Sequence, residues 1–166
     1  MIAIERVEAG HPSLARLESS DCEPLVRFFY RLSPQTVYRR FLSPIARPEQ
    51  LARMRLLELD GPERQAIAAL VDGEIVGVAR YAVDPRRPRT ADLGIVVADA
   101  WQRQGLGTRL LAALADRALQ AGVEQFGILT LADNQAAFRL LRRFAPTVPL
   151  SFDGGVYEAA LPLRAA

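Results

Sequence analysis

The spacing of apolar residues changes along the chain and divides it into a helical part and a mostly stranded part. Between residues 21 and 59 apolar residues recur every three to four positions, which is typical of amphipathic helices. We predict three helices there: one that begins at Asp21, one that begins at Ser33, and one over residues 48–59. Asp21 and Ser33 are residue types that cap helices, and a proline follows each of them within the first turn.

After residue 63 apolar and polar residues alternate, which predicts β-strands. The pair Asp72-Gly73 separates the first two strands and is a strong signal for a tight hairpin. The segment 84–89 is predicted to be a loop, because its two prolines and three arginines suit no strand pairing. The predicted strands, including two short N-terminal candidates, cover residues 2–7, 14–17, 64–71, 74–83, 91–97, 125–131, 147–152 and 156–163.

Two helices interrupt this stranded part. One opens at Gly105 and ends before Gly122, and the other covers residues 134–144. A strand, a helix and a further strand in succession favour one parallel strand pair around the first of these helices. The order of elements therefore predicts an α/β (α+β) fold with a mixed, mostly antiparallel sheet.

Composition narrows the class of protein. The 166 residues suit one domain, residues 1–166, and 50% hydrophobic and 24% charged residues are ordinary for a globular protein. No apolar run reaches the roughly 20 residues that a membrane span needs, and no signal-peptide pattern opens the chain. We therefore expect a cytoplasmic protein with no membrane partner. A net charge of +2 is too small to indicate a nucleic-acid partner.

Three residue types are rare or missing, and each excludes a kind of chemistry. His11 is the only histidine, which disfavours a histidine-rich metal site and a Ser-His-Asp triad, so we expect no metal. Cys22 is the only cysteine, which excludes an internal disulfide. All 21 basic residues are arginines, so the chain has no lysine side chain that could be acylated.

The strand over residues 91–97 leads through a seven-residue connection to Gly105 and Gly107, where a helix opens. Unpaired N–H groups at a glycine-rich helix start make a site for a phosphate. No Gly-Lys-Ser/Thr sequence follows, which excludes a P-loop, and Leu110 stands where a dinucleotide-binding turn needs its third glycine. These residues alone leave two interpretations open: a phosphate site, or an ordinary loop whose glycines only permit close packing.

A family resemblance favours the phosphate site. The sequence from Gln102 to Gly107 matches the Q/R-x-x-G-x-G/A motif of the GNAT family of N-acetyltransferases. Asn134 opens the next helix and matches, together with Ala137, the second motif of that family. The order of helices and strands is similar too, so the chain resembles this family over nearly its whole length. The resemblance implies a GNAT fold, with a sheet of six to seven strands and helices on both faces.

A narrower resemblance lies upstream, in the sequence LSPQTVYRRFLSP at residues 32–44. It is similar to a segment of the acetyltransferase domain of bacterial protein-lysine acetyltransferases. In those proteins the domain is often fused to a cyclic-nucleotide-binding or acyl-CoA-synthetase-like module, and nothing in this chain is long enough to be one. The resemblance therefore implies a catalytic domain that stands alone.

The family resemblance also implies acetyl-CoA as the donor. Backbone N–H groups of the glycine motif would hold its pyrophosphate, and nearby arginines would add charge-assisted bonds. The pantetheine arm would add to the strand 91–97 like a further strand, and the N–H of Val97 would stabilise the thioester oxygen as it becomes negative. The residues expected to bind acetyl-CoA are Ile95, Val96, Val97, Gln102, Arg103, Gln104, Gly105, Leu106, Gly107, Thr108, Arg109, Asn134 and Phe138.

An amine must lose a proton before it attacks, so the reaction needs a base. Asp92 is the candidate, because it is the only carboxylate of its strand and stands where the lysine-acetylating relatives commonly carry glutamate. We expect desolvation by the neighbouring Leu93, Ile95 and Val97 to make it a better base. The other interpretation is an aspartate that points into solvent.

The general acid is not identified. Many family members carry a tyrosine in the second motif that protonates the leaving thiolate, and Leu141 stands at that position here. Tyr157 and Tyr38 are weak candidates for the role. The missing tyrosine is also typical of the lysine-acetylating relatives, which favours a similar function.

The acceptor site is expected among the helices of residues 21–59 and the closing hairpin, with Tyr38, Arg39 and Arg40 as substrate-binding residues. Arginines there would favour a substrate with acidic surroundings, such as a protein loop or an acidic metabolite. Three functions stay open: a protein-lysine acetyltransferase, an acetyltransferase of a small amine, and a non-catalytic acyl-CoA-binding protein. A monomer and a homodimer both stay open.

Overall fold

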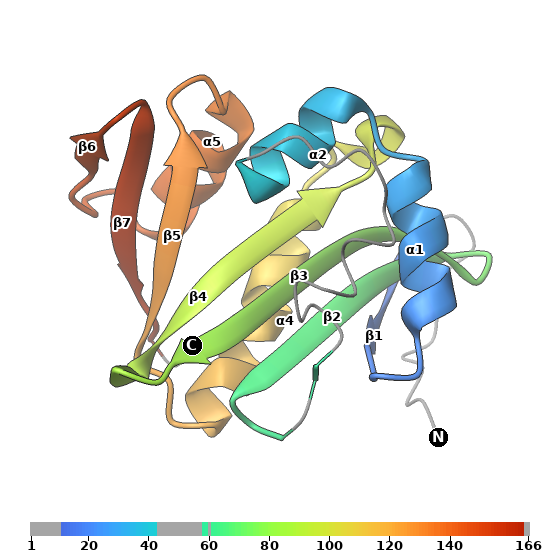
Figure 1. Ribbon diagram of the computed structural model, residues 1–166, viewed down its shortest axis with the longest axis horizontal. Helices are drawn as coiled ribbons and strands as arrows, with labels where there is room; N and C mark the ends of the chain where they lie inside the picture. The colour runs from blue at the N-terminus through green and yellow to red at the C-terminus, as the bar shows by residue number, and fades with distance from the viewer. Residues whose placement is uncertain (1–10, 43–57, 60, 165–166) are drawn as a thin grey trace.

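The computed structural model describes residues 11–42, 58–59 and 61–164 of the chain. Within these residues seven strands form one sheet in the order β1-β2-β3-β4-β5-β7-β6 (Figure 1). The strands are β1 (Ser13–Arg16), β2 (Arg64–Val71), β3 (Glu74–Asp84), β4 (Arg87–Val97), β5 (Gln125–Leu131), β6 (Ser151–Asp153) and β7 (Val156–Pro162). Every neighbouring pair is antiparallel except β4 and β5, which confirms the predicted mixed sheet. The predicted strand at 2–7 and nearly all of the predicted helix at 48–59 lie outside the described residues.

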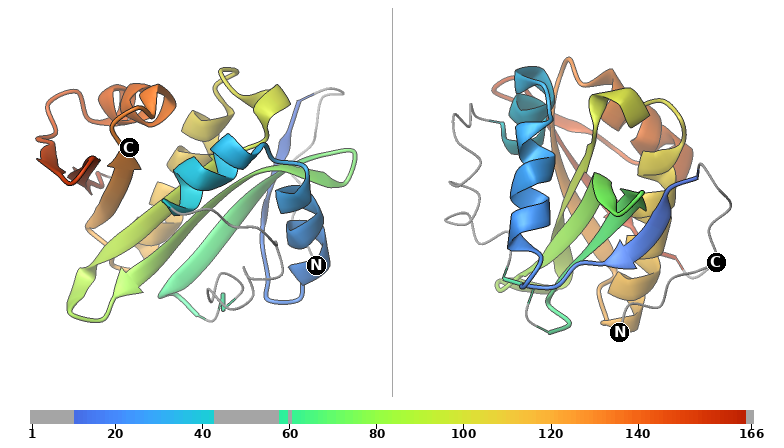
Figure 2. Two further views of the ribbon diagram at one scale, coloured as in Figure 1. Left: turned by 45° about the horizontal axis from the view of Figure 1, so that its top comes forward. Right: turned by 90° about the vertical axis from the view of Figure 1, so that its right-hand side faces the viewer.

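Helices cover both faces of the sheet, as predicted (Figure 2). Two of them, α1 and α2, pack on one face, and α4 and α5 pack on the other. The helices are α1 (Cys22–Tyr30), α2 (Pro34–Phe41), α4 (Leu106–Gln120) and α5 (Gln135–Phe144), with a short 3₁₀ helix η1 (Asp99–Trp101). Among these described helices, none is long and apolar enough to cross a membrane.

Strand alternation sorts the core into two layers, one on each side of the sheet. On β2, Ile67 packs in the layer under α4, whereas Ala68 packs in the layer under α1. Leu110 of α4 and Phe28 of α1 are fully buried in these two layers. Because burial of one such side chain contributes about 1.5–3 kcal/mol, the two layers hold the central strands firmly between the helices.

The sheet is open at one place, between β4 and β5. The two strands pair in parallel over three residues only, from Thr90 opposite Gln125 to Asp92 opposite Gly127. Beyond Asp92 they diverge (Figure 1), while β4 stays paired to β3 as far as Val97. The predicted parallel pair on either side of the α4 connection is confirmed, but its shortness leaves one edge of β4 without a strand partner.

Two predicted boundaries are wrong, and proline is involved in both. Only Pro85 and Arg86 of the segment 84–89 form a turn, because β4 already begins at Arg87 and Asp84 pairs with Arg87. An irregularity in the register next to Asp84 accommodates Pro88 within the strand. In the closing hairpin, β6 has only three residues, since Pro149 has no N–H for an earlier start of the pairing.

Candidate active site

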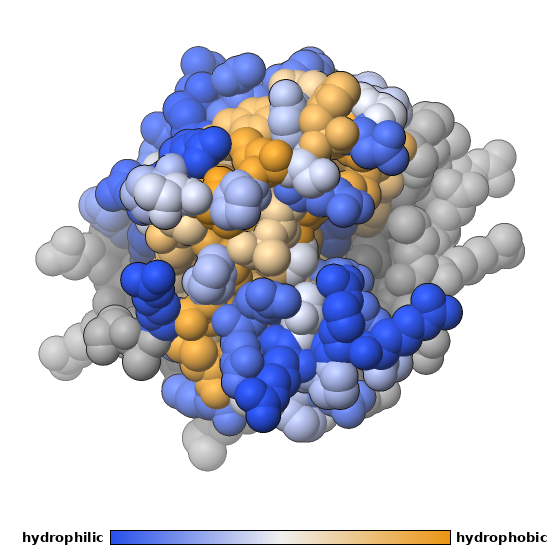
Figure 3. Space-filling view, turned by 90° about the vertical axis from the view of Figure 1, so that its left-hand side faces the viewer, coloured by the Kyte–Doolittle hydropathy of each residue, from blue (hydrophilic) through white to orange (hydrophobic). Residues whose placement is uncertain are grey.

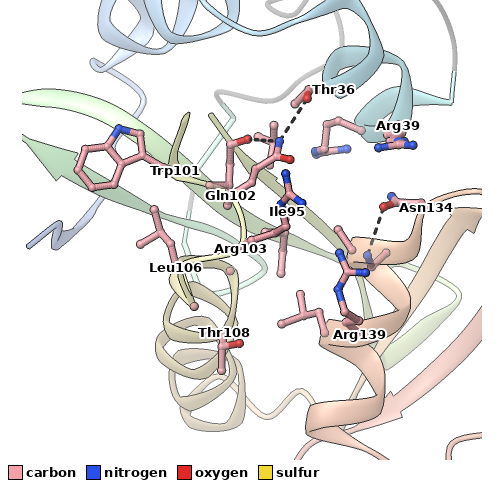
Figure 4. A pocket seen from close by; sticks show the side chains of 18 of the residues that line it. Thr36, Arg39, Ile95, Trp101, Gln102, Arg103, Leu106, Thr108, Asn134 and Arg139 are labelled. Carbon is pink, nitrogen blue, oxygen red and sulfur yellow. Dashed lines mark hydrogen bonds between the residues drawn. The ribbon is translucent and has the colours of Figure 1, made fainter. Parts of the chain in front are cut away.

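A cavity of about 500 Å³ opens where β4 and β5 diverge. Four parts of the fold line it (Figure 4): the edge of β4, the turn into α4, the first turns of α5, and α2. The cavity therefore joins both family motifs to the upstream segment 32–44.

The free edge of β4 presents backbone groups to this cavity. The N–H of Ala98 donates to the carbonyl of Val76 on β3 at 2.9 Å, and peptide groups alternate in direction along a strand. Every second residue before Ala98 therefore directs its N–H and C=O to β3 as well. The N–H and C=O groups of Ile95 and Val97, beyond the last pair with β5, face the opening instead.

The three residues expected to carry the pantetheine thus differ in what they offer. Ile95 and Val97 line the cavity with backbone groups that face it. Val96 also lines the cavity, but its N–H and C=O face β3 and its side chain is buried in the layer under α1. A ligand that adds to this edge can bond to the backbone at Ile95 and Val97 and not at Val96.

The glycine turn leaves the first N–H groups of α4 without partners inside the helix. Gly105 is the N-cap with a φ of 80°, in the left-handed region that favours glycine, and it has no side chain to cap the helix. The N–H of Leu106, Gly107 and Thr108 precede the first helical hydrogen bond, which Arg109 makes to the Gly105 carbonyl at 3.2 Å. All three residues line the cavity, where free N–H groups and the helix dipole suit an anion, so the phosphate-binding role of this turn stays a prediction.

The surroundings of Gly107 favour the phosphate interpretation of the glycine motif, which stays a prediction. Its φ is not positive, and a Cβ at this position would meet only the Leu140 side chain, at an ordinary contact distance of 3.9 Å. Neither backbone conformation nor packing therefore requires glycine at this position. The absence of a side chain keeps open the space in front of the N–H groups, which is what a bound phosphate needs.

Arginines surround the outer end of the cavity. Arg103 lines it as predicted, and Arg139 and Arg143 of α5 line it as well. Sequence reasoning missed the two residues of α5. Their four-residue spacing places them on one helix face. The sequence signal for them was this spacing within the helix that Asn134 opens.

Two predicted phosphate ligands are not in the cavity, which corrects the prediction. Arg109 donates to the carbonyl of Pro12 at 2.9 Å, because each helical residue is rotated by about 100° and position 109 turns away from the opening. Gln104 donates to the carbonyl of Ala100 at 2.9 Å and stabilises the turn itself. Among the described residues neither side chain lines the cavity.

Gln102 connects the glycine turn to α2. Its side-chain nitrogen donates to the carbonyl of Val97 at 3.0 Å and to the hydroxyl of Thr36 at 3.3 Å (Figure 4). It therefore stabilises the end of the open β4 edge through its side chain, rather than binding phosphate with it. This hydrogen bond gives Thr36, a residue of the upstream segment 32–44, a structural role at the cavity.

Asp99 strengthens the same connection. Its carboxylate accepts hydrogen bonds from the Ser33 N–H at 3.0 Å, the Ser33 hydroxyl at 2.7 Å and the Thr36 hydroxyl at 2.8 Å. Ser33 is also the N-cap of α2, as predicted, with its side chain accepting from the Thr36 N–H. Partial burial raises the pKa of Asp99, but the bonds from Ser33 and Thr36 outweigh it and hold that pKa below its ordinary value.

Asn134 and Phe138 lie on different sides of α5. Asn134 lines the cavity and caps the helix, with its side-chain oxygen accepting from the Ala137 N–H at 3.2 Å (Figure 4). Its amide nitrogen is left to donate to a ligand. Phe138 does not line the cavity, which corrects the prediction: it packs edge-on against Tyr157 of β7, with ring centroids 5.2 Å apart.

The cavity continues into a smaller inner chamber of about 90 Å³ beside the divergence of β4 and β5. Arg39 and Arg40 of α2 line both spaces, and their role in substrate binding stays a prediction. Tyr38 does not line either space and is 43% exposed, because it lies on another face of the short helix. The rim of the chamber reaches the exposed Leu129. Figure 3 shows apolar residues bordered by hydrophilic ones on the face that lies to the left in Figure 1.

Arg40 lies close against the sheet. A Cβ on Gly94 would collide with its guanidinium group, so Arg40 can keep this position only beside a residue that has no side chain. The guanidinium also lies 4.7 Å from the centre of the Phe41 ring. Burial and the neighbouring charge of Arg80 lower the pKa of Arg40 to about 10.

Asp92 is exposed, and its expected desolvation is therefore wrong. Alternate residues of a strand point to opposite faces, and Leu93, Ile95 and Val97 pack toward the α4 side. Asp92 shares the opposite face with Gly94, over which Arg40 lies. It does not line the cavity, so its role as a base stays a prediction.

The structure offers no tyrosine in the second motif or from β7 as an acid within the cavity. Leu141 is buried and lines the inner chamber. Tyr157 packs between Phe138 and Phe152 and, among the described residues, is not part of the cavity wall.

An open strand edge beside an anion site suits a long ligand with amide groups and a phosphate at one end, which is the description of a coenzyme A thioester. The fold and this cavity thus define the class of acyltransferases that use such thioesters. The chain belongs to the acetyltransferase (GNAT) family, whose sequence model matches residues 28–145, and it is an acetyl-CoA-dependent N-acetyltransferase. This confirms the family resemblance.

Comparison with individual proteins gives the same family. Acetyltransferase PA5475 of Pseudomonas aeruginosa is 33% identical over 138 residues, which are 80% of this chain and 74% of that protein. Acetyltransferase Pat of Mycolicibacterium smegmatis is 30% identical over 115 residues, covering 67% of this chain and 34% of that protein, so the match spans about a third of it. The crystal structure of the GNAT domain of S. lividans PAT has a TM-score of 0.84 at 24% identity, covering 98% of this chain and 97% of that one. At that identity the likeness concerns the fold alone.

Proposed function

We propose that this protein transfers an acetyl group from acetyl-CoA to a lysine side chain of another protein, by direct attack of the amine on the thioester. The divergence of β4 from β5 carries the proposal, because it creates a strand edge beside the glycine turn within one cavity. Two observations support a protein lysine as the acceptor: the segment 32–44 and the similarity to the acetyltransferase Pat.

The outer end of the cavity would bind the donor. Acetyl-CoA supplies an acetyl group already activated as a thioester. The N–H groups of Leu106, Gly107 and Thr108 would hold its pyrophosphate, and Arg103 and Arg143 would add charge-assisted bonds. Backbone groups of β4 would pair with the amides of the pantetheine arm as a neighbouring strand would.

Residues of β4 would then assist the chemical step. The N–H of Val97 would donate to the thioester oxygen as negative charge develops on it. Asp92, the only carboxylate of β4, would take the proton that the amine loses, directly or through a water molecule. A thiolate is a better leaving group than an alkoxide because a thiol, with a pKa of about 8.5, is a stronger acid than an alcohol, so a leucine at position 141 is compatible with the reaction.

Binding and turnover measurements separate this function from the two alternatives. Calorimetry with acetyl-CoA and CoA tests the donor site. Thiol release is then measured with lysine peptides, with the same peptides carrying norleucine in place of lysine, and with small amines. Because the chain contains no lysine, every acetylated lysine found by mass spectrometry belongs to the acceptor.

We expect both nucleotides to bind, and thiol release to require the lysine of the peptide. Turnover of small amines alone would favour the small-amine enzyme. Firm binding without turnover on any acceptor would favour the non-catalytic acyl-CoA-binding protein. Absence of binding would contradict all three functions.

A further inference from the structure

The inner chamber has hydrogen-bond donors that the protein does not satisfy. Thr130 of β5 lines the chamber and is 3% exposed, and its hydroxyl has no partner among the described residues. The Nε of Arg39 is also buried and has no partner within the same part of the chain. Buried polar groups without hydrogen bonds destabilise a fold, so two of them in one cavity wall indicate a ligand.

Arg40 adds a positive charge to the same wall. Its contacts are the Phe41 ring and the backbone at Gly94, and none of the ion pairs between described residues includes it. Burial and the neighbouring charge of Arg80 lower the pKa of Arg40 to about 10, and within the described part of the chain no anion stands beside this cation.

The rest of the chamber selects the kind of ligand. No acidic residue lines it within the described chain, and its other walls are mostly leucine and isoleucine side chains. An acetyl group has one oxygen and no charge, so it would leave the donors and the cation unsatisfied. A carboxylate has two acceptor oxygens and a negative charge, and a guanidinium and a hydroxyl can bind it together.

We propose that the inner chamber is a carboxylate subsite of the transferase. This rests on the proposed function and specifies its substrate. The carboxylate has two possible sources: the far end of a dicarboxylic acyl group, as in succinyl-CoA, or an acidic side chain beside the acceptor lysine. In both cases the amine nitrogen bonds to the thioester carbon, the carbon–sulfur bond breaks, sulfur leaves as the thiolate, and the amine proton passes to the base. The carboxylate itself is unchanged.

The first arm of the test compares donors by calorimetry. Succinyl-CoA and butyryl-CoA have acyl chains of four carbons and differ in the terminal carboxylate. If the acyl group supplies the carboxylate, succinyl-CoA binds about ten-fold or more tightly than butyryl-CoA, as expected for one charge-assisted pair.

The second arm compares acceptors with acetyl-CoA as the donor. Two peptides are used that are identical except for glutamate or glutamine next to the lysine. If the acceptor supplies the carboxylate, kcat/KM is about ten-fold higher for the glutamate peptide.

Three variants assign the preference to the chamber. Arg40→Met keeps an apolar stem of similar reach and should abolish the preference in whichever arm shows it. Thr130→Val keeps the shape of the side chain, should reduce the preference several-fold, and should melt no lower than the wild type because it removes an unsatisfied hydroxyl. The matched control is Arg89→Met, an exposed arginine paired with Glu124 at the far end of β4, which should leave the preference unchanged.

The outcomes separate this proposal from the proposed function. An Arg40-dependent preference in either arm supports the carboxylate subsite and names its source. If CoA binds and neither arm shows a preference, or if the preference survives Arg40→Met and Thr130→Val, the subsite is overturned while the transferase stands. If CoA itself does not bind, the proposed function fails and the subsite fails with it.

Discussion

Backbone groups form most of the outer end of the cavity, whereas side chains form the inner chamber. The outer end consists largely of backbone: the N–H groups of Leu106, Gly107 and Thr108, with the edge of β4 leading away from them. The inner chamber consists of side chains, among them Arg40 and Thr130, that α2 and β5 bring together. A site made of backbone can keep its geometry while most side chains change. A site made of side chains can be altered by one substitution, so the inner chamber is where specificity can vary.

The largest expected effect is a loss of kcat on substitution of Asp92, which lies at the last residue pair between β4 and β5. Asp92→Asn removes the proposed base and should lower kcat about 100-fold, because proton transfer by a positioned group contributes on that scale. The affinity for acetyl-CoA should change less than two-fold, since the outer end is untouched. Stopped-flow or steady-state assays of thiol release measure kcat, and calorimetry measures the affinity for acetyl-CoA. Asp116→Asn, an exposed residue of α4, is the control, and an unchanged kcat in Asp92→Asn would remove the assignment.

The second prediction concerns the outer end. Gly107→Ala places a methyl group in front of the N–H groups and should weaken CoA binding about ten-fold, the value of one charge-assisted hydrogen bond. Because alanine favours a helix over glycine and the space is open, the free energy of unfolding should stay the same or rise. The control is Gly73→Ala, at a turn with a φ of 79°, which should lose about 1 kcal/mol of stability and keep CoA affinity. The same pattern in both variants would mean that glycine is needed at 107 for the fold.

The third prediction concerns the connection between the two ends. Asp99→Asn weakens the hydrogen bonds that join Ser33 and Thr36 to the turn before α4. We expect a loss of about 1 kcal/mol in the free energy of unfolding, at the low end for bonds to a charged group because the site is exposed. The KM for the acceptor should rise several-fold, with a smaller change in CoA affinity, since α2 carries Arg39 and Arg40. A larger change for CoA than for the acceptor would contradict this division.

The smallest expected effect is the pH dependence of the difference in unfolding free energy between wild type and Asp99→Asn. The folded pKa of Asp99 lies below its ordinary value, so the carboxylate stabilises the fold fully above the unfolded pKa of about 3.9. This contribution is lost as the pH falls through the folded pKa. Chemical unfolding at a series of pH values should therefore show wild type and Asp99→Asn differing at neutral pH and converging as the pH falls through the folded pKa of Asp99. A constant difference across this range would show that Asp99 acts without its charge.

The elements that depend on local backbone geometry could be predicted from the sequence. Glycines, caps and alternation leave local signals, and they indicated the parallel pair, the start of α4 at Gly105 and the cap at Ser33. The exposure of Asp92 was within reach too, because its position differs by one from those of Leu93, Ile95 and Val97, and a strand sends such neighbours to opposite faces.

The side-chain half could not be predicted in the same way. Whether Arg139 and Arg143 face the cavity depends on how α5 is rotated against the sheet. That Arg40 lies over Gly94 depends on how closely α2 approaches β4. The direction of Arg109 depends on where the chain before β1 lies, because Arg109 donates to the carbonyl of Pro12, just before that strand. These are long-range packing relationships, and no local period in the sequence records them.

The gap between β4 and β5 is an unprotected edge placed inside a sheet rather than at its border. A border strand with free N–H and C=O groups invites any extended polypeptide to pair with it, which leads to aggregation. Here α2, α5 and the turn into α4 stand around the opening. The unpaired edge therefore opens into a cavity of about 500 Å³ with helices around it, and not onto the outer border of the sheet. The protein thus keeps the pairing capacity of an edge strand at a place that its own helices surround.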